Sequence, residues 1–210
     1  MKPNLRIGLD FDNTLAGYDE LFHRVALEKN LIDPVIPPNK RAVRDHIRTR
    51  QNGEIEWQVL QGIVYGPRMG EALLFDGVRD FLRHCRQVGA ATFVVSHKTE
   101  FANFDPTQTP LREAALSWLD AHGLFSGDAP SLGRTNVFFE ATRQGKLARI
   151  EQLGCTHFVD DLEEVFNETG FPEKTTKILF APHHLTSLSG AMHLASTWAE
   201  IAHLVFPDAA

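Results

Sequence analysis

Short apolar runs alternate with amphipathic stretches along most of the chain. The apolar runs predict buried strands over residues 5–9, 91–95, 136–139, 156–159 and 177–180. The stretches that follow carry apolar residues at helical spacing and predict helices over 77–88, 110–122, 146–153 and 191–205. Runs of this kind, separated by helices, are typical of a parallel sheet covered on both faces. The pattern therefore predicts a doubly wound, Rossmann-like α/β core.

One long stretch interrupts this alternation between the first two predicted strands. Amphipathic helices are expected over residues 19–30, 39–51 and 54–64, with a proline-rich joint between the first two. This is far more chain than one crossover helix requires. We interpret residues 18–74 as a small helical cap inserted into a core formed by 1–17 and 75–210. The alternative is an elaborated crossover that packs flat on the sheet.

Composition and charge narrow the class of protein. The chain has 210 residues, 43% of them hydrophobic and 23% charged, as expected for a globular protein. A formal net charge of −6 disfavours nonspecific binding to nucleic acid or to anionic lipid. No apolar run approaches the roughly 20 residues that span a bilayer, and no signal-peptide pattern follows Met1. We expect a cytoplasmic protein with a small-molecule partner, and neither nucleic acid nor membrane as a partner.

Acidic residues follow two of the predicted strands where ligands of open parallel sheets bind, beyond the carboxyl ends. Asp10 and Asp12 follow the first strand, and Asp160 and Asp161 follow the fourth. Converging carboxylates raise one another's pKa unless a cation neutralises them. Oxygen ligands without a histidine or cysteine set indicate a hard cation such as Mg²⁺. Residues two apart on an extended chain face the same way, so Asp10 and Asp12 could serve as nucleophile and proton carrier.

These residues bring the chain to a known family. The run Asp10-Phe11-Asp12-Asn13-Thr14-Leu15 after an apolar strand resembles the first motif of the haloacid dehalogenase (HAD) superfamily. Ser96 resembles the second motif, Lys146 the third, and Asp160-Asp161 the fourth, in the family's order. The predicted insertion also lies where the family has its helical cap. The resemblance covers the predicted core.

The resemblance implies a role for each matching position. Asp10 would form an aspartyl-phosphate, and Asp12 would act as general acid and then general base. Asp10, the backbone carbonyl of Asp12, and Asp160 would hold Mg²⁺, with Asp161 as a direct or water-bridged ligand. Ser96 and Lys146 would bind the phosphoryl oxygens, with Lys98 as a competitor for the role of Lys146. Thr14 would support this phosphate site by fixing the loop after the nucleophile through a bond from its hydroxyl to the backbone.

Other residues are candidates for substrate selection. His97 and Lys98 directly follow the second predicted strand and should border the pocket. Trp57, Tyr65 and Arg68 lie in the expected cap, where aromatic and guanidinium groups suit a sugar, a base or a second anion. Aromatic residues at helical spacing also suit a helical core.

The function expected is Mg²⁺-dependent hydrolysis of a small phosphorylated metabolite. Asp12 argues against a dehalogenase, because a haloacid has no leaving oxygen that needs a proton. A phosphonatase would need a Schiff-base lysine, for which the expected cap offers Lys29 and Lys40. Phosphoryl transfer to an acceptor other than water stays open. A protein phosphatase is disfavoured by the long cap, and a non-catalytic binding module by the intact motifs. The sequence leaves the substrate and the oligomeric state open.

Overall fold

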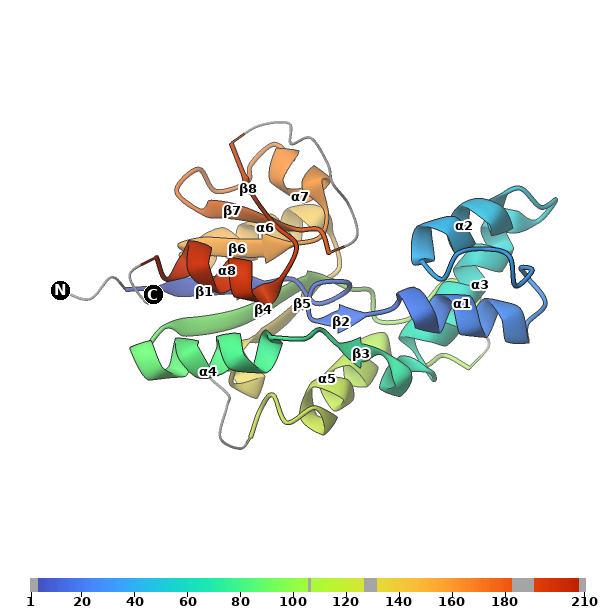
Figure 1. Ribbon diagram of the computed structural model, residues 1–210, viewed down its shortest axis with the longest axis horizontal. Coiled ribbons are helices and arrows are strands. Elements are labelled where there is room, and N and C mark those ends of the chain that lie inside the picture. The colour runs from blue at the N-terminus through green and yellow to red at the C-terminus, as the bar shows by residue number, and fades with distance from the viewer. Residues whose placement is uncertain (1–3, 106, 127–131, 183–190, 208–210) are drawn as a thin grey trace. The chain divides into compact units, whose positions relative to one another are not determined.

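A computed structural model describes residues 4–105, 107–126, 132–182 and 191–207. Its contacts divide the chain into two compact units. The first comprises Met1–Leu15, Leu74–Lys98 and Asp120–Ala210, and the second comprises Ala16–Leu73 and Thr99–Leu119. Figure 1 shows the elements of both units, coloured along the chain.

A parallel sheet forms the centre of the first unit. Its strands follow the order β5-β4-β1-β6-β7-β8, and every neighbouring pair is parallel. The strands are β1 (Arg6–Leu9), β4 (Ala91–His97), β5 (Val137–Glu140), β6 (His157–Asp160), β7 (Thr176–Phe180) and β8 (His193–Ala195). The order reverses at β1, because the chain first builds outward to β4 and β5 and then crosses to β6. The predicted doubly wound α/β fold is confirmed, with β8 as a strand that the sequence did not predict.

The centre of the sheet is packed closely around β1. Leu9 is in register with Val94 of β4 and Val159 of β6, so these three strands end together. Gly8 lies so close to Phe158 that an added Cβ would come within 2.5 Å of the ring. Only glycine fits there without a shift of the ring, because real Cβ atoms do not come so close to carbon. This packing fixes the position of the carboxyl end of β1 at the sheet edge.

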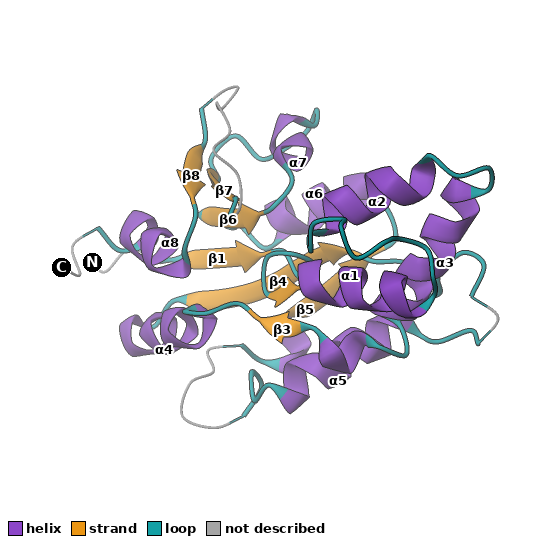
Figure 2. Ribbon diagram, turned by 45° about the vertical axis from the view of Figure 1, so that its right-hand side comes forward, coloured by secondary structure: helices purple, strands orange, loops and turns teal. Residues whose placement is uncertain are grey.

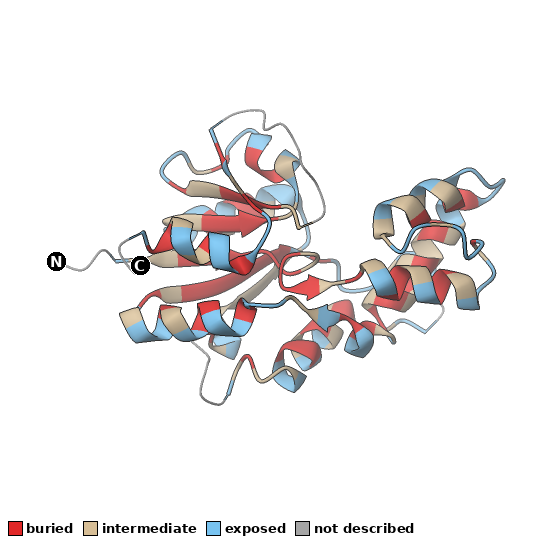
Figure 3. Ribbon diagram, viewed as in Figure 1, coloured by how far each residue is buried: buried red, intermediate tan, exposed pale blue. Residues whose placement is uncertain are grey.

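Helices cover both faces of this sheet (Figure 2). They are α4 (Val78–Val88), α6 (Arg143–Gln152), α7 (Glu163–Asn167) and α8 (Trp198–Val205), with a short 3₁₀ turn, η2, at Arg134–Asn136. Residues of α6 and α7 pack in one cluster with Phe93 and Phe158 of the sheet. Phe81 of α4 and Phe180 of β7 both contact Trp198 of α8. Helices α6 and α7 therefore line one apolar core and α4 and α8 another, and Figure 3 shows that the strands between them are largely buried.

The last predicted helix, over residues 191–205, is too long. Residues His193–Ala195 form β8 instead, and α8 begins at Trp198. Thr197 ends the extended chain, because its side chain accepts a hydrogen bond from the backbone N–H of Glu200. The Glu200 carboxylate accepts in turn from the backbone N–H of Ser196. This reciprocal capping starts a helix after Ser196 and leaves the preceding residues free to pair with β7.

The second unit is helical and has an aromatic core. Its elements are α1 (Asp19–Glu28), α2 (Lys40–Arg48), α3 (Gly53–Tyr65), the 3₁₀ turn η1 (Met69–Glu71) and most of α5 (Leu111–Ala121). Phe22 of α1 stacks on Trp57 of α3 with ring centroids 4.9 Å apart. The short strands β2 (Ala16–Gly17) and β3 (Leu73–Leu74) pair with each other. The helices expected over 19–30, 39–51 and 54–64 correspond to α1, α2 and α3.

This second unit contains more chain than the stretch 18–74 that the sequence singled out. It also takes in Thr99–Leu119. That segment is tied to the rest of the unit by a hydrogen bond from the indole N–H of Trp118 to the carbonyl of Ala72, at 2.9 Å. The side chains of Ala102 and Asp105 also lie against Gly62 of α3. Contacts that are distant in sequence therefore determine how far the unit extends.

In the part of the chain that the structure describes, no helix combines the length and the apolar character needed to cross a membrane.

Candidate active site

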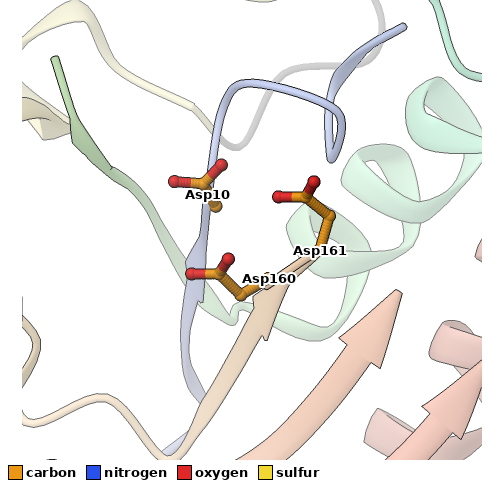
Figure 4. A group of neighbouring side chains, drawn as sticks. All are labelled: Asp10, Asp160 and Asp161. Atoms are coloured by element: carbon orange, nitrogen blue, oxygen red, sulfur yellow. The ribbon is translucent and has the colours of Figure 1, made fainter. Parts of the chain in front are cut away.

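Three carboxylates meet at the carboxyl ends of β1 and β6 (Figure 4). Asp10 directly follows β1, Asp160 is the last residue of β6, and Asp161 comes next. One oxygen from each lies within 4.8 Å of the others. The backbone N–H of Asp10 donates to the carbonyl of Val159 at 2.8 Å, which fixes Asp10 beside β6. Three of the four carboxylates that the sequence predicted to converge at this edge therefore meet in the first unit, and Asp12 is not one of them.

Lys146 neutralises part of this acidic cluster. It lies in the first turns of α6, whose start is set by Thr142, because the Thr142 side chain accepts from the backbone N–H of Gly145 at 3.0 Å. The helix thus begins at Arg143, before the predicted 146. The Lys146 ammonium donates to Asp10 at 2.5 Å and to Asp160 at 2.6 Å. One buried cation therefore joins the ends of two strands.

Burial and charge shift the proton affinities of this group. Burial, opposed by Lys146 and assisted by the charges of Asp160 and Asp12, raises the pKa of Asp10 to about 7. Burial acts against the charged form of Lys146, but the Asp10 and Asp160 carboxylates outweigh it and hold the pKa of Lys146 above its ordinary value. Lys146 is therefore a permanent cation, whereas Asp10 carries its charge at a cost unless further positive charge is supplied.

A second ion pair involves the loop that follows β1. The Lys98 ammonium is 2.8 Å and 3.1 Å from the two carboxylate oxygens of Asp12. The backbone turns between Asp12 and Thr14, where Asn13 adopts a left-handed φ of 57°. Asp10 and Asp12 therefore pair with different lysines. The sequence indicated that Lys98 lies near this edge, but it did not reveal its partner.

The side chains at the carboxyl end of β4 alternate in direction. Ser96 is buried, His97 is exposed, and Lys98 is buried again. The ring of His97 lies 3.1 Å from the carbonyl oxygen of Ala141. This is the period-two alternation of an extended chain, and it gives Ser96 and Lys98 the same side. His97, a substrate candidate from the sequence, faces the other side and contacts backbone after β5.

Thr14 lies completely buried in the loop that follows β1. Its hydroxyl has no hydrogen-bond partner among the described residues, so the expected bond to the loop backbone is not formed there. The loop is closed instead by the backbone N–H of Leu15, which donates to the carbonyl of Phe11 at 3.0 Å. A buried hydroxyl without a partner is uncommon in folded proteins and suits a site that acquires a polar ligand or a water molecule.

The remaining sequence candidates belong to the second unit. Trp57 is buried and stacks on Phe22, as a core residue does. The ring of Tyr65 packs edge-on against Tyr18 and Phe22. The guanidinium of Arg68 donates to the carboxylates of Glu28 and Glu71. Within this unit Trp57 and Tyr65 belong to the aromatic core and Arg68 belongs to a surface ion-pair network.

The donor set fits a small hard cation. The clustered atoms of Asp10, Asp160 and Asp161 are all carboxylate oxygens, which suit Mg²⁺ and not the softer metals that select sulfur or imidazole. Asp160 is held in place because its Oδ1 accepts from the backbone N–H of Leu162 at 3.0 Å. A divalent cation would also offset the charge that raises the pKa of Asp10. These three residues are therefore the ones that would hold a metal.

Comparison with known proteins agrees with the fold. No protein-family model matches the sequence, and no curated protein matches it. Among solved structures, a HAD family hydrolase from Deinococcus radiodurans with bound phosphate and sodium aligns at a TM-score of 0.58 and 13% identity, covering 99% of this chain and 97% of that one. A HAD-superfamily hydrolase of subfamily IA from Geobacter sulfurreducens aligns at 0.57 and 14%, covering 96% of each chain. A dehalogenase aligns at 0.54 and 13%, covering 97% of this chain and 98% of that one. The chain has the fold of the HAD-superfamily hydrolases.

Proposed function

We propose that the chain is a Mg²⁺-dependent phosphohydrolase that acts on a small phosphorylated metabolite through an aspartyl-phosphate on Asp10. The observation that carries this proposal is the environment of Asp10. Asp10 is only 4% exposed, its carboxylate is bonded to Lys146, and it shares a cluster of oxygens with Asp160 and Asp161. Such a group can approach a phosphate dianion only where positive charge cancels the repulsion.

The residues of the chain divide the work between them. Asp10 attacks the phosphorus, the bond to the leaving oxygen breaks, and that oxygen takes a proton from Asp12. Water then attacks the phosphorus of the aspartyl-phosphate, Asp12 takes the proton of the water, and inorganic phosphate leaves as Asp10 is restored. Ser96 and Lys146 bind phosphoryl oxygens. Asp10, Asp160 and Asp161 would hold Mg²⁺, which would supply positive charge to lower the repulsion between carboxylate and phosphate.

Asp12 favours this chemistry over dehalogenation. The departure of a halide requires no proton, whereas an alkoxide leaving group requires one. Asp12 lies two residues after Asp10 in the loop that follows β1, where its carboxyl group would carry that proton. A phosphonatase is less well supported, because the ammonium of Lys40 lies 5.6 Å from the centroids of two aromatic rings, which stabilise its charged form. A Schiff base requires the neutral amine.

The proposal is tested by phosphate release from an array of phosphorylated metabolites with Mg²⁺. Wild type and Asp10→Asn are compared, with Asp80→Asn as a matched control on the surface of α4. We expect release by wild type and Asp80→Asn and none by Asp10→Asn. Chloride release from 2-chloroacids is measured in parallel and is expected to be absent. Turnover by Asp10→Asn near the wild-type rate would remove Asp10 as the nucleophile, and chloride release without phosphate release would replace the proposed reaction.

A further inference from the structure

Two buried lysines of the first unit pair with different aspartates. Lys98 is 4% exposed and Lys146 is 2% exposed. Lys146 bridges Asp10 and Asp160, and Lys98 contacts both carboxylate oxygens of Asp12. Burying an ammonium group is costly unless it is paired with an anion in good geometry. The HAD-type roles described above account for Lys146 and leave the second buried lysine without a function.

The position of the Lys98 ammonium is fixed from the backbone outward. The backbone N–H of Lys98 donates to the carbonyl of Glu140 at 3.0 Å and so continues the pairing of β4 with β5. The ammonium lies 5.3 Å from the ring centroid of Phe11, which is itself fully buried against Phe139. A cation held by a sheet and by an aromatic face has little freedom to move.

The side chain of Asp12 is less buried than that of Lys98. Asp12 lies in the loop after β1, next to the left-handed residue Asn13, and its side chain is 21% exposed. A carboxylate in such a loop can turn toward solvent or toward the nearest positive charge. Contact with both of its oxygens restricts this rotation, because a turn of the carboxylate would lengthen the contacts to Lys98.

We infer that Lys98 is a positioning residue that holds the Asp12 carboxylate in the orientation needed for its proton transfers. The inference rests on the proposed function for the role of Asp12. Asp12 must face the leaving oxygen in one step and the attacking water in the next, so its orientation matters in both. Lys98 gives Asp12 a cation separate from the one that binds Asp10, which keeps the proton carrier apart from the nucleophile.

A different role for Lys98 would be direct binding of the phosphoryl group. The two roles predict different effects of the leaving group on the decrease in rate that follows removal of the Lys98 side chain. A phosphate-binding cation contacts a part common to every substrate, so its loss should slow all substrates by a similar factor. A positioning residue for a general acid matters most where the leaving oxygen is basic and least where it departs readily as a phenolate.

The experiment measures the phosphorylation step on phosphate monoesters from an acidic nitrophenol to a simple alcohol. Lys98→Met, Asp12→Asn and the double variant are compared with wild type. We expect Lys98→Met to slow the alkyl ester roughly tenfold to a hundredfold, which is less than the full loss of general acid catalysis because Asp12 is still present, and the nitrophenyl ester by less than about threefold. The double variant should be no slower than Asp12→Asn within about twofold, because Lys98 acts through Asp12.

Lys177→Met is the matched control, because Lys177 is another partly buried lysine of this unit with a fixed partner, the carbonyl of Phe166 at 2.6 Å. In Lys177→Met the rate should depend on the leaving group as it does in wild type. Lys98→Gln, whose amide can still donate to Asp12, should be faster than Lys98→Met on the alkyl ester, and it serves as the second variant if methionine prevents folding. An equal loss on all esters, or losses that multiply in the double variant, would overturn the inference.

A crystal structure of Lys98→Met tests the same inference without relying on activity. We expect the Asp12 carboxylate to turn away from the orientation it has beside Lys98. If it keeps that orientation, Lys98 does not position it, whatever the reaction of the enzyme. Failure of the proposed function would be seen separately, as wild-type protein that releases no phosphate from any ester.

Discussion

The two units differ in what they bury. The polar and charged side chains that are fully buried in the described structure all belong to the first unit, and they are Asp10, Thr14, Thr92, Ser96, Lys98, Lys146, Asp160 and Thr175. The described residues of the second unit bury aromatic and aliphatic side chains such as Tyr18, Phe22 and Trp57. Its ion pairs, for example Arg48 with Glu54, lie near the surface.

This difference indicates where stability has been given up for chemistry. A buried charge costs free energy, and a cluster of ionisable groups with perturbed pKa values is a common feature of functional sites. Asp10, whose pKa is raised by burial, lies in such a cluster. The described residues of the second unit have an apolar interior, which contributes to stability through packing. Substitutions in the first unit should therefore affect turnover most, and those in the core of the second unit should affect stability.

The largest effect is expected from removal of the metal. EDTA should stop phosphate release completely, because Asp10, Asp160 and Asp161 then leave their negative charge facing the substrate. Mg²⁺ should restore the activity, and Ca²⁺ should restore it poorly because its larger and looser coordination shell misplaces the nucleophile. The measurement is phosphate release after dialysis and readdition of each ion. Full activity in EDTA would show that the acidic cluster is not a metal site.

A large loss of stability is expected from Trp57→Ala in the second unit. Trp57 is 2% exposed and stacks on Phe22, so its truncation leaves a cavity that should cost about 3–5 kcal/mol of unfolding free energy. Urea unfolding measures this cost, and turnover per folded molecule should change little. Arg48→Ala, at an exposed ion pair of the same unit, is the control and should unfold almost as wild type does. A stable Trp57→Ala protein with altered substrate ranking would instead assign Trp57 to substrate recognition.

A loss of about a hundredfold or more in turnover is expected from Asp12→Asn, the usual scale for a general acid or base. The amide keeps the shape of the carboxylate but cannot exchange the proton. Mg²⁺ affinity, measured by calorimetry on the same variant, should be nearly unchanged. If the affinity for Mg²⁺ falls and the rate at saturating Mg²⁺ does not, Asp12 contributes to metal binding and not to proton transfer.

The smallest effect is a gain of stability in metal-free Asp10→Asn. The pKa of Asp10 is raised to about 7 in the folded protein, so this carboxyl favours folding most below its ordinary pKa and loses that contribution as the pH rises through 7. Above pH 7 the variant avoids a buried charge and should melt a few degrees higher, at roughly 2–4 °C for each kcal/mol. The difference should shrink toward pH 5. A variant that melts lower than wild type at pH 8 would mean that the pairing with Lys146 outweighs the burial of Asp10.

Some parts of the site could be read from the sequence because they depend on local order. A parallel sheet brings the residues after its strands to one edge, so the meeting of Asp10 with Asp160 and Asp161 could be expected from the strand pattern alone. The limits of α4 likewise followed from apolar spacing, because Val78, Phe81, Leu82 and Cys85 are its buried residues. The start of α8 was missed, although the Thr197-x-x-Glu200 capping pattern was visible in the sequence.

By itself, the sequence determined the fold class and the order in which acidic and basic residues arrive at the sheet edge. Only the tertiary structure decided which lysine pairs with which aspartate, how deeply each is buried, and that Thr99–Leu119 packs with the helices of the second unit. The reason is physical. Backbone periodicity is a local property that the sequence carries directly, whereas an ion pair between Asp12 and Lys98 depends on where a strand and a loop distant in sequence come to rest.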